Sequence, residues 1–301
     1  MSASEAQRIV VFGATGMLGS MLMRVLPKAL PDWEIWGVAR TRLEHPRLAG
    51  ARLRIEPDLT EAHTLDRLWR ELRPSVAINA VGIVKQRPEA NDPLATISVN
   101  ALFPHRLHAI AQLHGTRLIH ISTDCVFSGR RGGYREEDPP DPEDLYGRSK
   151  LLGEPLGAGV LTLRTSIIGP ELREPGVGLL SWFLAQRGRV AGYRRAFFSG
   201  LPTVVLAQLL ADLIARWPHL DGLYHVAAER ISKWELLALV RDIYGLNVVE
   251  LAPEDHVVVD RSLDARKFYS DTGWRAPPWR ELVEQMYIDH CHDGGKAWLS
   301  R

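Results

Sequence analysis

Short apolar runs recur along the first half of the chain, and most are followed by a longer stretch with helical spacing of apolar residues. The runs are rich in Val, Ile and Leu, as is usual for strands that are buried on both faces of a parallel sheet. Strands are predicted at residues 9–12, 34–39, 52–55, 76–79, 117–122 and 160–164, and helices between them at 17–26, 60–72 and 93–114. This alternation favours an α/β fold, a Rossmann-type doubly wound parallel sheet covered by helices on both faces.

Beyond residue 168 the pattern loosens into loops with Gly and Pro around one predicted helix at residues 177–186. We interpret residues 169–301 as a smaller C-terminal lobe and residues 1–168 as the main domain. The two are expected to be interleaved, because a helix and a strand within residues 201–228 have the pattern of elements that return to the main sheet.

Two helices have sequence signals at their N-termini. Thr60 precedes the helix that ends near residue 72 and is expected to cap it. Ser232 and Glu235 have the spacing of a capping box, so another helix is predicted to begin there.

Glycines recur every third residue directly after the first predicted strand, at Gly13, Gly16 and Gly19. A strand, a tight glycine turn and a helix N-terminus form an anion site, because unpaired N–H groups and the helix dipole point at a pyrophosphate. The spacing G-x-x-G-x-x-G is not specific, and a strand–helix turn that merely needs small residues is the alternative. The turn alone leaves both interpretations open.

Tyr146 and Lys150 lie four residues apart at the start of a predicted helix and therefore share one of its faces. A tyrosine hydroxyl has a pKa of about 10, and a neighbouring cation is expected to lower that pKa. Such a tyrosine can protonate an alkoxide as hydride reaches a carbonyl carbon. An exposed i,i+4 pair is the structural alternative.

Ser122 and Thr123 stand where the fifth predicted strand ends. Ligands of open α/β sheets bind at the carboxyl ends of the strands, and a hydroxyl there can donate a hydrogen bond to a substrate oxygen. Ser or Thr at the end of a strand is common, but its coincidence with the glycine turn and with Tyr146 and Lys150 favours a dehydrogenase-type site.

Composition argues against a polymer or a membrane as the partner. The 301 residues include 37 Lys and Arg against 36 Asp and Glu, a balance that does not favour binding to nucleic acid or an anionic membrane surface. No apolar run approaches the roughly 20 residues of a membrane span. Residues 1–7 are polar and only two cysteines occur, so a cytoplasmic protein without a disulfide framework is expected.

The chain resembles the extended short-chain dehydrogenase/reductases, and among them the dTDP-4-dehydrorhamnose reductases. That family's S-T-D-Y-V-F appears here as S-T-D-C-V-F at residues 122–127, and its Y-G-x-x-K-x-x-G-E appears at residues 146–154. Further matches are L-R-T-S at 163–166, L-P-T at 201–203, G-L-Y-H at 222–225 and R-S-L-D at 261–264. The resemblance covers nearly the whole chain.

The resemblance implies hydride transfer from a nicotinamide cofactor to the C4 keto group of a nucleotide-linked deoxysugar, with Thr123, Tyr146 and Lys150 as catalytic residues. The main domain would hold NADP and the smaller lobe the nucleotide sugar. The expected cofactor-binding residues are Gly13, Thr15, Gly16, Met17, Leu18, Gly19, Arg40, Asp58, Leu59, Asn79, Ala80, Val81, Tyr146 and Lys150. The expected substrate-binding residues are Val84, Lys85, Ser122, Thr123, Asp124, Tyr146 and Arg261. No metal ligands are assigned, and a homodimer stays open.

Arg40 indicates which cofactor is bound. Dinucleotide folds that use NAD place an acid after the second strand, where it binds the ribose 2′-hydroxyl. Here no acid follows that strand, and Arg40 is placed to meet a 2′-phosphate. NADPH is therefore expected, with NADH as the alternative.

Two departures from the family pattern bear on the reaction. Dehydratases of the superfamily carry Glu after the Asp of this motif, whereas Cys125 stands here, so dehydration is disfavoured. Lys85 and Arg87 replace an acidic segment of the rhamnose-pathway reductases and leave the identity of the sugar open. Two other functions also stay open. One is a non-catalytic NADP-binding subunit, like the regulatory subunit of methionine adenosyltransferase, and the other is nucleotide-sugar epimerisation.

Overall fold

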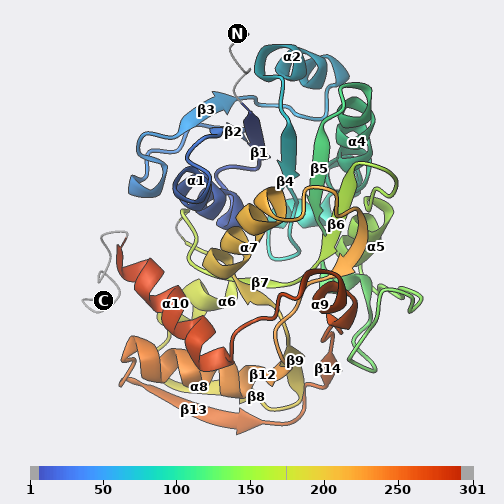
Figure 1. Cartoon of the computed structure of the whole chain (residues 1–301). Coiled ribbons are helices and arrows are strands. Elements are labelled where there is room, and N and C mark those ends of the chain that lie inside the picture. The colour runs from blue at the N-terminus through green and yellow to red at the C-terminus, as the bar shows by residue number, and fades with distance from the viewer. Residues whose placement is uncertain (1–6, 174, 293–301) are drawn as a thin grey trace.

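A computed structural model of the chain describes residues 7–173 and 175–292. Seven parallel strands form its central sheet: β1 (Arg8–Phe12), β2 (Glu34–Ala39), β3 (Arg52–Ile55), β4 (Val76–Asn79), β5 (Arg117–Ile121), β6 (Val160–Arg164) and β11 (Gly222–His225). Their order across the sheet is β11-β6-β5-β4-β1-β2-β3 (Figure 1). The chain thus runs outward from β1 in both directions, as in a doubly wound sheet. The predicted fold class is confirmed.

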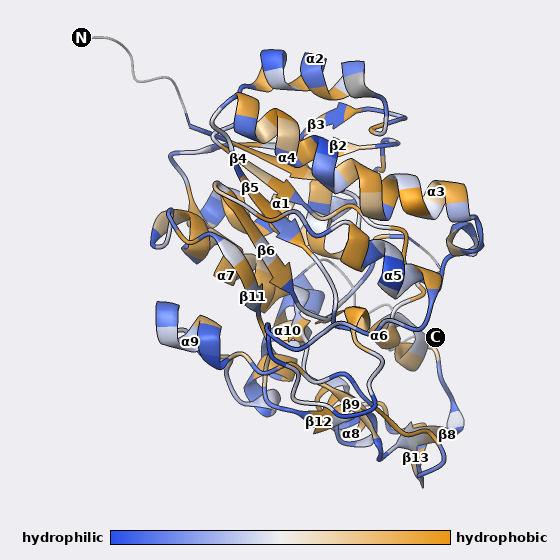
Figure 2. Ribbon diagram, turned by 90° about the vertical axis from the view of Figure 1, so that its right-hand side faces the viewer, coloured by the Kyte–Doolittle hydropathy of each residue, from blue (hydrophilic) through white to orange (hydrophobic). Residues whose placement is uncertain are grey.

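Side chains alternate between the two faces of the sheet and meet different helices. Ile9 and Val11 of β1 pack in one apolar cluster with α1 (Met17–Ala29) and α7 (Thr203–Ala215). Val10 and Phe12 pack in the other with α2 (Ala62–Leu72) and α4 (Phe103–Leu113). Figure 2 shows the strands as an apolar layer between these helices. Because both faces are covered, central strands such as β1 and β4 are buried along nearly their whole length, whereas the edge strand β3 alternates between Arg and apolar residues.

The helix predicted at residues 93–114 is present but is not regular. It consists of α3 (Pro93–Ile97), a π-helical turn (Ser98–Leu102) and α4. Such single turns insert one residue into a helix and often lie at functional sites. Asn100, on this turn, is fully buried.

One predicted cap is confirmed and the other is wrong. Ser232 and Glu235 form both hydrogen bonds of a capping box at the start of α8 (Lys233–Tyr244). Thr60 does not cap α2, which has Glu61 as its N-cap residue. Thr60 instead donates its backbone N–H and its hydroxyl to the Asp58 carboxylate, at 2.7 and 2.6 Å. This local turn competes with capping because one short polar side chain satisfies both donors.

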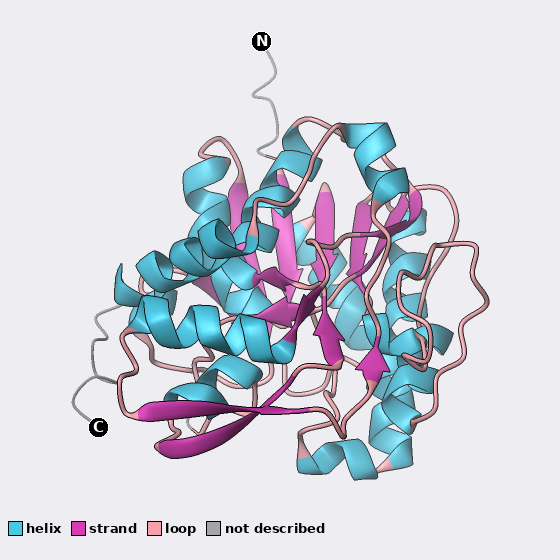
Figure 3. Cartoon of the chain, turned by 90° about the horizontal axis from the view of Figure 1, so that it is seen from below, coloured by secondary structure: helices cyan, strands magenta, loops and turns pink. Residues whose placement is uncertain are grey.

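The C-terminal part of the chain builds small sheets beside the carboxyl edge of the main sheet. Strands β8 (Gly188–Tyr193) and β13 (Val249–Glu254) pair in parallel, while β9 (Ala196–Phe198) lies between β12 (Ile231–Ser232) and β14 (Val259–Asp260). Helices α8 and α10 (Trp279–His292) pack against each other here (Figure 1). Figure 3 shows this end of the molecule from below. The remaining elements are α5 (Leu145–Leu152), α6 (Leu179–Leu184), α9 (Arg266–Thr272), β7 (Ile167–Ile168) and β10 (Leu201–Pro202).

Strand β11 pairs with β6 at the edge of the main sheet, so the chain re-enters that sheet after building β8 and β9. The division into two domains at residue 168 stays a prediction. Within the described ranges, no helix is long and apolar enough to cross a membrane.

Candidate active site

The glycine turn leads from β1 into α1 at the carboxyl edge of the sheet. Gly13 has a φ of +84°, in the left-handed region, and a side chain there would lie 2.8 Å from the Ala80 carbonyl oxygen. A side chain at Gly19 would collide with the Gly13 carbonyl. Gly16 is the N-cap residue of α1, and no side chain caps this helix. The turn therefore leaves a bare helix N-terminus that a pyrophosphate can approach closely. Thr15, Met17 and Leu18 belong to the same turn or to the start of α1.

Strand β4 lies beside β1, and the chain leaves it through Asn79, Ala80 and Val81. The buried Asn79 amide is hydrogen-bonded to the His120 ring (Nδ2 to Nδ1, 3.0 Å), and its Oδ1 accepts from the Val81 N–H at 3.1 Å. Burial, with a smaller contribution from the Lys150 ammonium, holds the pKa of His120 well below its usual value. The neutral ring is therefore a fixed hydrogen-bond partner for Asn79 beside the glycine turn.

Tyr146 and Lys150 share one face of α5. The helix is capped by Asp144, whose carboxylate accepts from the Gly147 N–H at 2.7 Å. A side chain at Gly147 would collide with the backbone of the segment that follows β5, so glycine lets α5 lie against that segment. Lys150 is buried, and its Nζ donates to the Ile121 carbonyl, the last of β5, at 2.8 Å. Packing thus fixes the lysine directly under the end of β5.

The hydroxyls of Ser122 and Thr123 have different partners. Thr123 donates to the Asp124 carboxylate at 3.2 Å, and its hydroxyl lies close enough to the Tyr146 hydroxyl to act on the pKa of that group. Ser122 donates its proton to Glu154 at 2.5 Å. The structure therefore brings Thr123 and Tyr146 together, whereas the proton that Ser122 was expected to offer a substrate is already engaged.

Glu154 belongs to a buried ion pair behind this site. Its two carboxylate oxygens accept from Nε and Nη2 of Arg164 at 2.9 and 2.8 Å, and the two side chains are only 6% and 4% exposed. The guanidinium also lies 5.3 Å from the centre of the Phe127 ring. The pair joins β6 to the second residue after α5, and so it fixes the end of the helix that carries Lys150.

Burial dominates the titration of the tyrosine and the lysine. It raises the pKa of Tyr146, and the neighbouring Cys125 and Asp124 add to the shift. It lowers the pKa of Lys150 to about 8, with Glu154 opposing the change. The expectation of a lowered Tyr146 pKa is wrong for the protein chain alone, because desolvation of the phenolate outweighs the Thr123 hydroxyl, which acts in the opposite direction. Tyr146 is accordingly a protonated hydroxyl, the form that a proton donor needs.

Arg40 follows β2 directly and is exposed. Within the described residues, no hydrogen bond or ion pair engages its guanidinium. Asp58 and Leu59 follow β3, where the Asp58 carboxylate is occupied by Thr60 and the Leu59 side chain is buried in the core. Of these three expected cofactor residues, Arg40 is therefore the one whose charged group is available to bind a ligand.

Asn100 is a site residue that the sequence analysis did not identify. Its Oδ1 accepts from the Ile83 N–H at 2.8 Å, and its Nδ2 donates to the Ile83 carbonyl at 2.9 Å and to Ser149 at 3.2 Å. A side chain at Gly153 would collide with the Asn100 carbonyl. Asn100 therefore joins the loop after β4 to α5. The side-chain amide reaches both the loop and α5 because Asn100 lies on the π-helical turn. No sequence pattern predicts that turn.

The residues expected to bind substrate come from three separate segments. Val84 and Lys85 are exposed on the loop after β4, and Arg261 donates its Nε to the Phe127 carbonyl at 2.8 Å. Burial raises the pKa of Asp124, and the charges of Arg261 and Lys85 act in the opposite direction. Both cations therefore lie within electrostatic range of the residue that follows Thr123.

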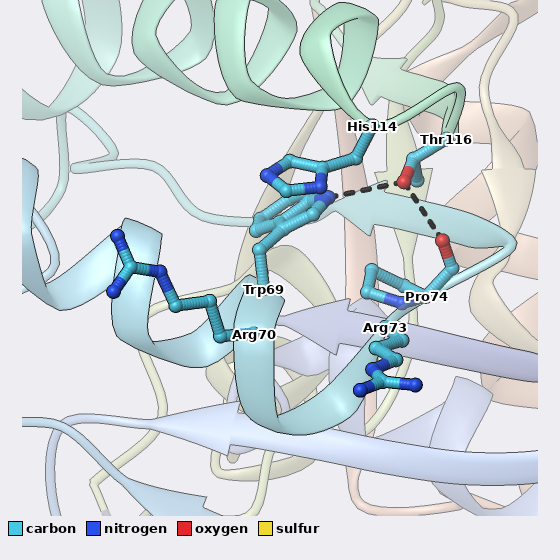
Figure 4. Close-up of a pocket in the computed structure, with 6 residues that line it drawn as sticks. All are labelled: Trp69, Arg70, Arg73, Pro74, His114 and Thr116. Atoms are coloured by element: carbon cyan, nitrogen blue, oxygen red, sulfur yellow. Dashed lines mark hydrogen bonds between the residues drawn. The ribbon is translucent and has the colours of Figure 1, made fainter.

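A hollow of about 520 Å³ lies at the opposite end of the sheet from the glycine turn and is lined by Trp69, Arg70, Arg73, Pro74, His114 and Thr116 (Figure 4). The Thr116 hydroxyl accepts from Trp69 Nε1 at 3.0 Å and donates to the Pro74 carbonyl at 2.7 Å. These two hydrogen bonds connect the end of α2 to the start of β5, so we assign the residues that line the hollow a structural role. Neither here nor elsewhere in the described ranges do three or more His, Cys, Asp or Glu side chains gather as metal ligands.

The glycine turn, the Thr123–Tyr146 contact and the buried Lys150 thus meet at one edge of the sheet. A family model described as the RmlD substrate binding domain matches residues 7–291. The chain belongs to this family. The resemblance inferred from the motifs is confirmed.

Curated relatives of this RmlD family member have different functions. The beta subunit of methionine adenosyltransferase 2 from Bos taurus is 27% identical over 262 residues, which are 82% of this chain and 75% of the subunit. The spore coat polysaccharide biosynthesis protein SpsK of Bacillus subtilis (strain 168) is 24% identical, over 92% of this chain and 96% of SpsK.

Solved structures share the fold over its whole length. The dTDP-4-dehydrorhamnose reductase of Bacillus anthracis in complex with NADP has a TM-score of 0.79 at 23% identity, covering 96% of this chain and all of that one. A hypothetical dTDP-4-dehydrorhamnose reductase from Sulfolobus tokodaii has a TM-score of 0.75 at 26% identity, covering 91% and 98%. The Bordetella bronchiseptica enzyme WbmG, in complex with NAD and UDP, has a TM-score of 0.78 at 21% identity, covering 96% of each chain.

Proposed function

We propose that this RmlD family member is an NADPH-dependent reductase of the 4-keto group of a nucleotide-activated deoxysugar. The observation that carries the proposal is the approach of Thr123 to Tyr146, one helical turn from the buried Lys150. This proton-donating pair lies at the carboxyl edge of the sheet, where β4 alone separates β5 from β1 and its glycine turn. Structures with the same fold hold NADP in the Bacillus anthracis reductase and NAD with UDP in WbmG, which supports a nicotinamide dinucleotide and a nucleotide sugar as ligands.

The glycine turn fits such a dinucleotide. A side chain at Gly13 or Gly19 would clash with the backbone, and the N-terminus of α1 has no side-chain cap. These features leave room and unpaired N–H groups for a pyrophosphate. Arg40 would hold a 2′-phosphate, since its guanidinium is exposed and unengaged among the described residues. When bound, the reduced nicotinamide supplies a hydride.

The chain's own residues handle the proton and orient the substrate. Tyr146 holds a proton on its hydroxyl, because burial raises its pKa, and donates it to the keto oxygen as that oxygen becomes an alkoxide. Thr123, whose hydroxyl proton goes to the Asp124 carboxylate at 3.2 Å in the free protein, turns that proton to the same oxygen and stabilises its developing charge. Lys150, held by the Ile121 carbonyl, provides a cation behind the tyrosine that stabilises the phenolate left after the transfer.

Cys125 favours reduction over dehydration, because it stands where dehydratases have a glutamate. Burial raises the pKa of its thiol to about 12, so at neutral pH it is neither a carboxylate-like base nor a thiolate. A residue that cannot take a proton at neutral pH does not support the elimination of water. The proposed reaction is therefore reduction without prior dehydration.

The test is a screen of nucleotide-4-keto-6-deoxysugars, with NADPH oxidation followed at 340 nm and the 4-hydroxy product identified by NMR. Tyr146→Phe is the matched variant because it removes one oxygen. It should bind NADPH as the wild type does, while kcat falls by about 10²- to 10⁴-fold. A near wild-type rate in this variant would exclude Tyr146 as the acid.

The beta subunits of methionine adenosyltransferase 2 favour a second candidate, a cofactor-binding regulatory subunit, because their identity with this chain is 27% over 82% of its length. The same screen separates the two functions. Tight NADPH binding without turnover of any keto-sugar would favour the regulatory role. Interconversion of sugar epimers without accumulation of NADP⁺ would indicate an epimerase instead.

A further inference from the structure

We infer that Arg173 binds the 2′-phosphate of NADP together with Arg40, so that the choice of cofactor depends on the segment after β7 as well as on the end of β2. This inference rests on the proposed NADPH-dependent function and adds to it a second phosphate-binding residue. Arg173 lies 132 residues beyond Thr41, the neighbour of Arg40, so only the tertiary structure brings the two arginines to one place.

One hydrogen bond places the Arg173 guanidinium at the end of β2. Its Nη2 donates to the Thr41 hydroxyl at 3.0 Å, and Thr41 directly follows Arg40. In dinucleotide folds, the residues after the second strand recognise the 2′ position of the adenine ribose. Arg173 is therefore held beside the place where the 2′-phosphate is expected.

The chain just before Arg173 is fixed to the main sheet at two points. Leu172 is 7% exposed and packs in the apolar cluster that contains α1 and α7. The buried Arg47, in the connection between β2 and β3, donates its Nη1 to the Pro170 carbonyl at 3.5 Å. Packing thus sets the position of the Arg173 backbone, and the contact with Thr41 follows from that position.

The chain after Arg173 leads to the glycine turn. A side chain at Gly178, the N-cap residue of α6, would lie 2.7 Å from the Cε of Met17, the first residue of α1. Residues on both sides of Arg173 therefore contact the two parts of the main domain that the adenosine diphosphate half of a dinucleotide approaches, the N-terminus of α1 and the end of β2.

The cations at the end of β2 have no carboxylate partners. Within the described ranges, neither Arg40 nor Arg173 forms an ion pair, and the same is true of the exposed Arg42. A phosphate monoester carries about −1.5 to −2 charges at pH 7, so a single arginine would neutralise it incompletely. Two guanidinium groups supply a matching charge and two planar sets of N–H donors for the phosphate oxygens.

The Thr41 hydroxyl adds a donor to the same place. Its oxygen accepts from Arg173, and a hydroxyl that accepts one hydrogen bond can still donate its own proton. No residue in the described part of the chain accepts that proton. The contact therefore orients the guanidinium and leaves the hydroxyl proton for the phosphate.

The experiment measures nucleotide binding by calorimetry and does not depend on turnover. The probes are 2′,5′-ADP and 5′-AMP, which differ only in the 2′-phosphate, so the ratio of their Kd values isolates that group. Arg173→Ala is compared with Arg173→Lys, which keeps the charge without the planar guanidinium, and with Arg40→Ala. Arg189→Ala is the control for loss of one exposed guanidinium, because Arg189 lies on β8, in a small sheet away from β2 (Figure 1).

Arg173→Ala should weaken 2′,5′-ADP by about ten-fold and leave 5′-AMP unchanged, because the variant loses a charge-assisted contact to the 2′-phosphate alone. Arg173→Lys should lose less, and Arg189→Ala should bind both nucleotides as the wild type does. The double variant of Arg40→Ala and Arg173→Ala should bind the two nucleotides equally. Since the described partner of Arg173 is one exposed hydroxyl, Arg173→Ala should melt at the wild-type temperature.

A wild-type preference for 2′,5′-ADP in Arg173→Ala, together with a reduced preference in Arg40→Ala, would overturn the inference and leave the proposed function intact. Arg173 would then only attach its segment to Thr41. Failure of the proposed function has a different signature, in which the preference for 2′,5′-ADP depends on Arg173 while no keto-sugar is reduced.

Discussion

Replacing Lys150 by Met should stabilise the free protein while it damages the catalytic site. Lys150 is buried, and burial lowers the pKa of its ammonium from 10.5 to about 8. A difference of 2.5 pKa units at 1.36 kcal/mol per unit is about 3 kcal/mol by which the folded state disfavours the charged lysine. Methionine has a similar length and no charge, so it should remove most of this cost.

The gain should depend on pH in a defined way. Because the folded pKa lies below the unfolded one, the unfolded state binds more protons between about pH 8 and 10.5, and the wild type gains stability as the pH rises through that window. The advantage of Lys150→Met should therefore be about 3 kcal/mol at pH 7 and below about 1 kcal/mol at pH 10.

Urea denaturation at pH 7 and pH 10 measures this difference in the free energy of unfolding. The contributions of the other titrating groups cancel when the variant is compared with the wild type at the same pH. Lys28→Met serves as the control, since an exposed lysine should give no pH-dependent gap. A Lys150→Met protein that is less stable than the wild type at pH 7, or whose advantage does not change with pH, would refute burial as the cause. The hydrogen bond to the Ile121 carbonyl would then outweigh desolvation.

Two further substitutions test the cofactor choice and the ion pair. Arg40→Asp should weaken NADPH by about ten- to a hundred-fold more than NADH in fluorescence titrations, because it removes a charge-assisted contact to a 2′-phosphate; equal losses would contradict that contact. Glu154→Gln should lower the free energy of unfolding by about 3–5 kcal/mol in chemical denaturation, because it leaves the Arg164 guanidinium buried without its carboxylate. Glu71→Gln, which breaks exposed pairs with Arg54 and Arg67, should cost no more than about 1 kcal/mol, and similar losses in the two variants would argue against a buried pair.

The sequence by itself determined the main sheet, because a strand buried on both faces must be apolar throughout and therefore stands out from the helices between. It also placed Thr123, Tyr146 and Lys150 correctly at the end of a strand and on the next helix. Local signals suffice there, since helical spacing puts residues 146 and 150 on one face and the chain order puts Thr123 at the edge of the sheet. Motif matches then identified the family that the comparison confirmed.

Only the tertiary structure decided how these groups behave. The direction of the Tyr146 pKa shift depends on burial, which the spacing of a tyrosine and a lysine does not reveal. The proton of Ser122 goes to Glu154, and Asn100 reaches α5 from a π-helical turn, because of contacts between segments 32 and 49 residues apart. Lys233 is in sequence only the first residue of a capped helix. Its charge interacts with that of Asp124, 109 residues earlier in the chain, and no local pattern encodes that approach.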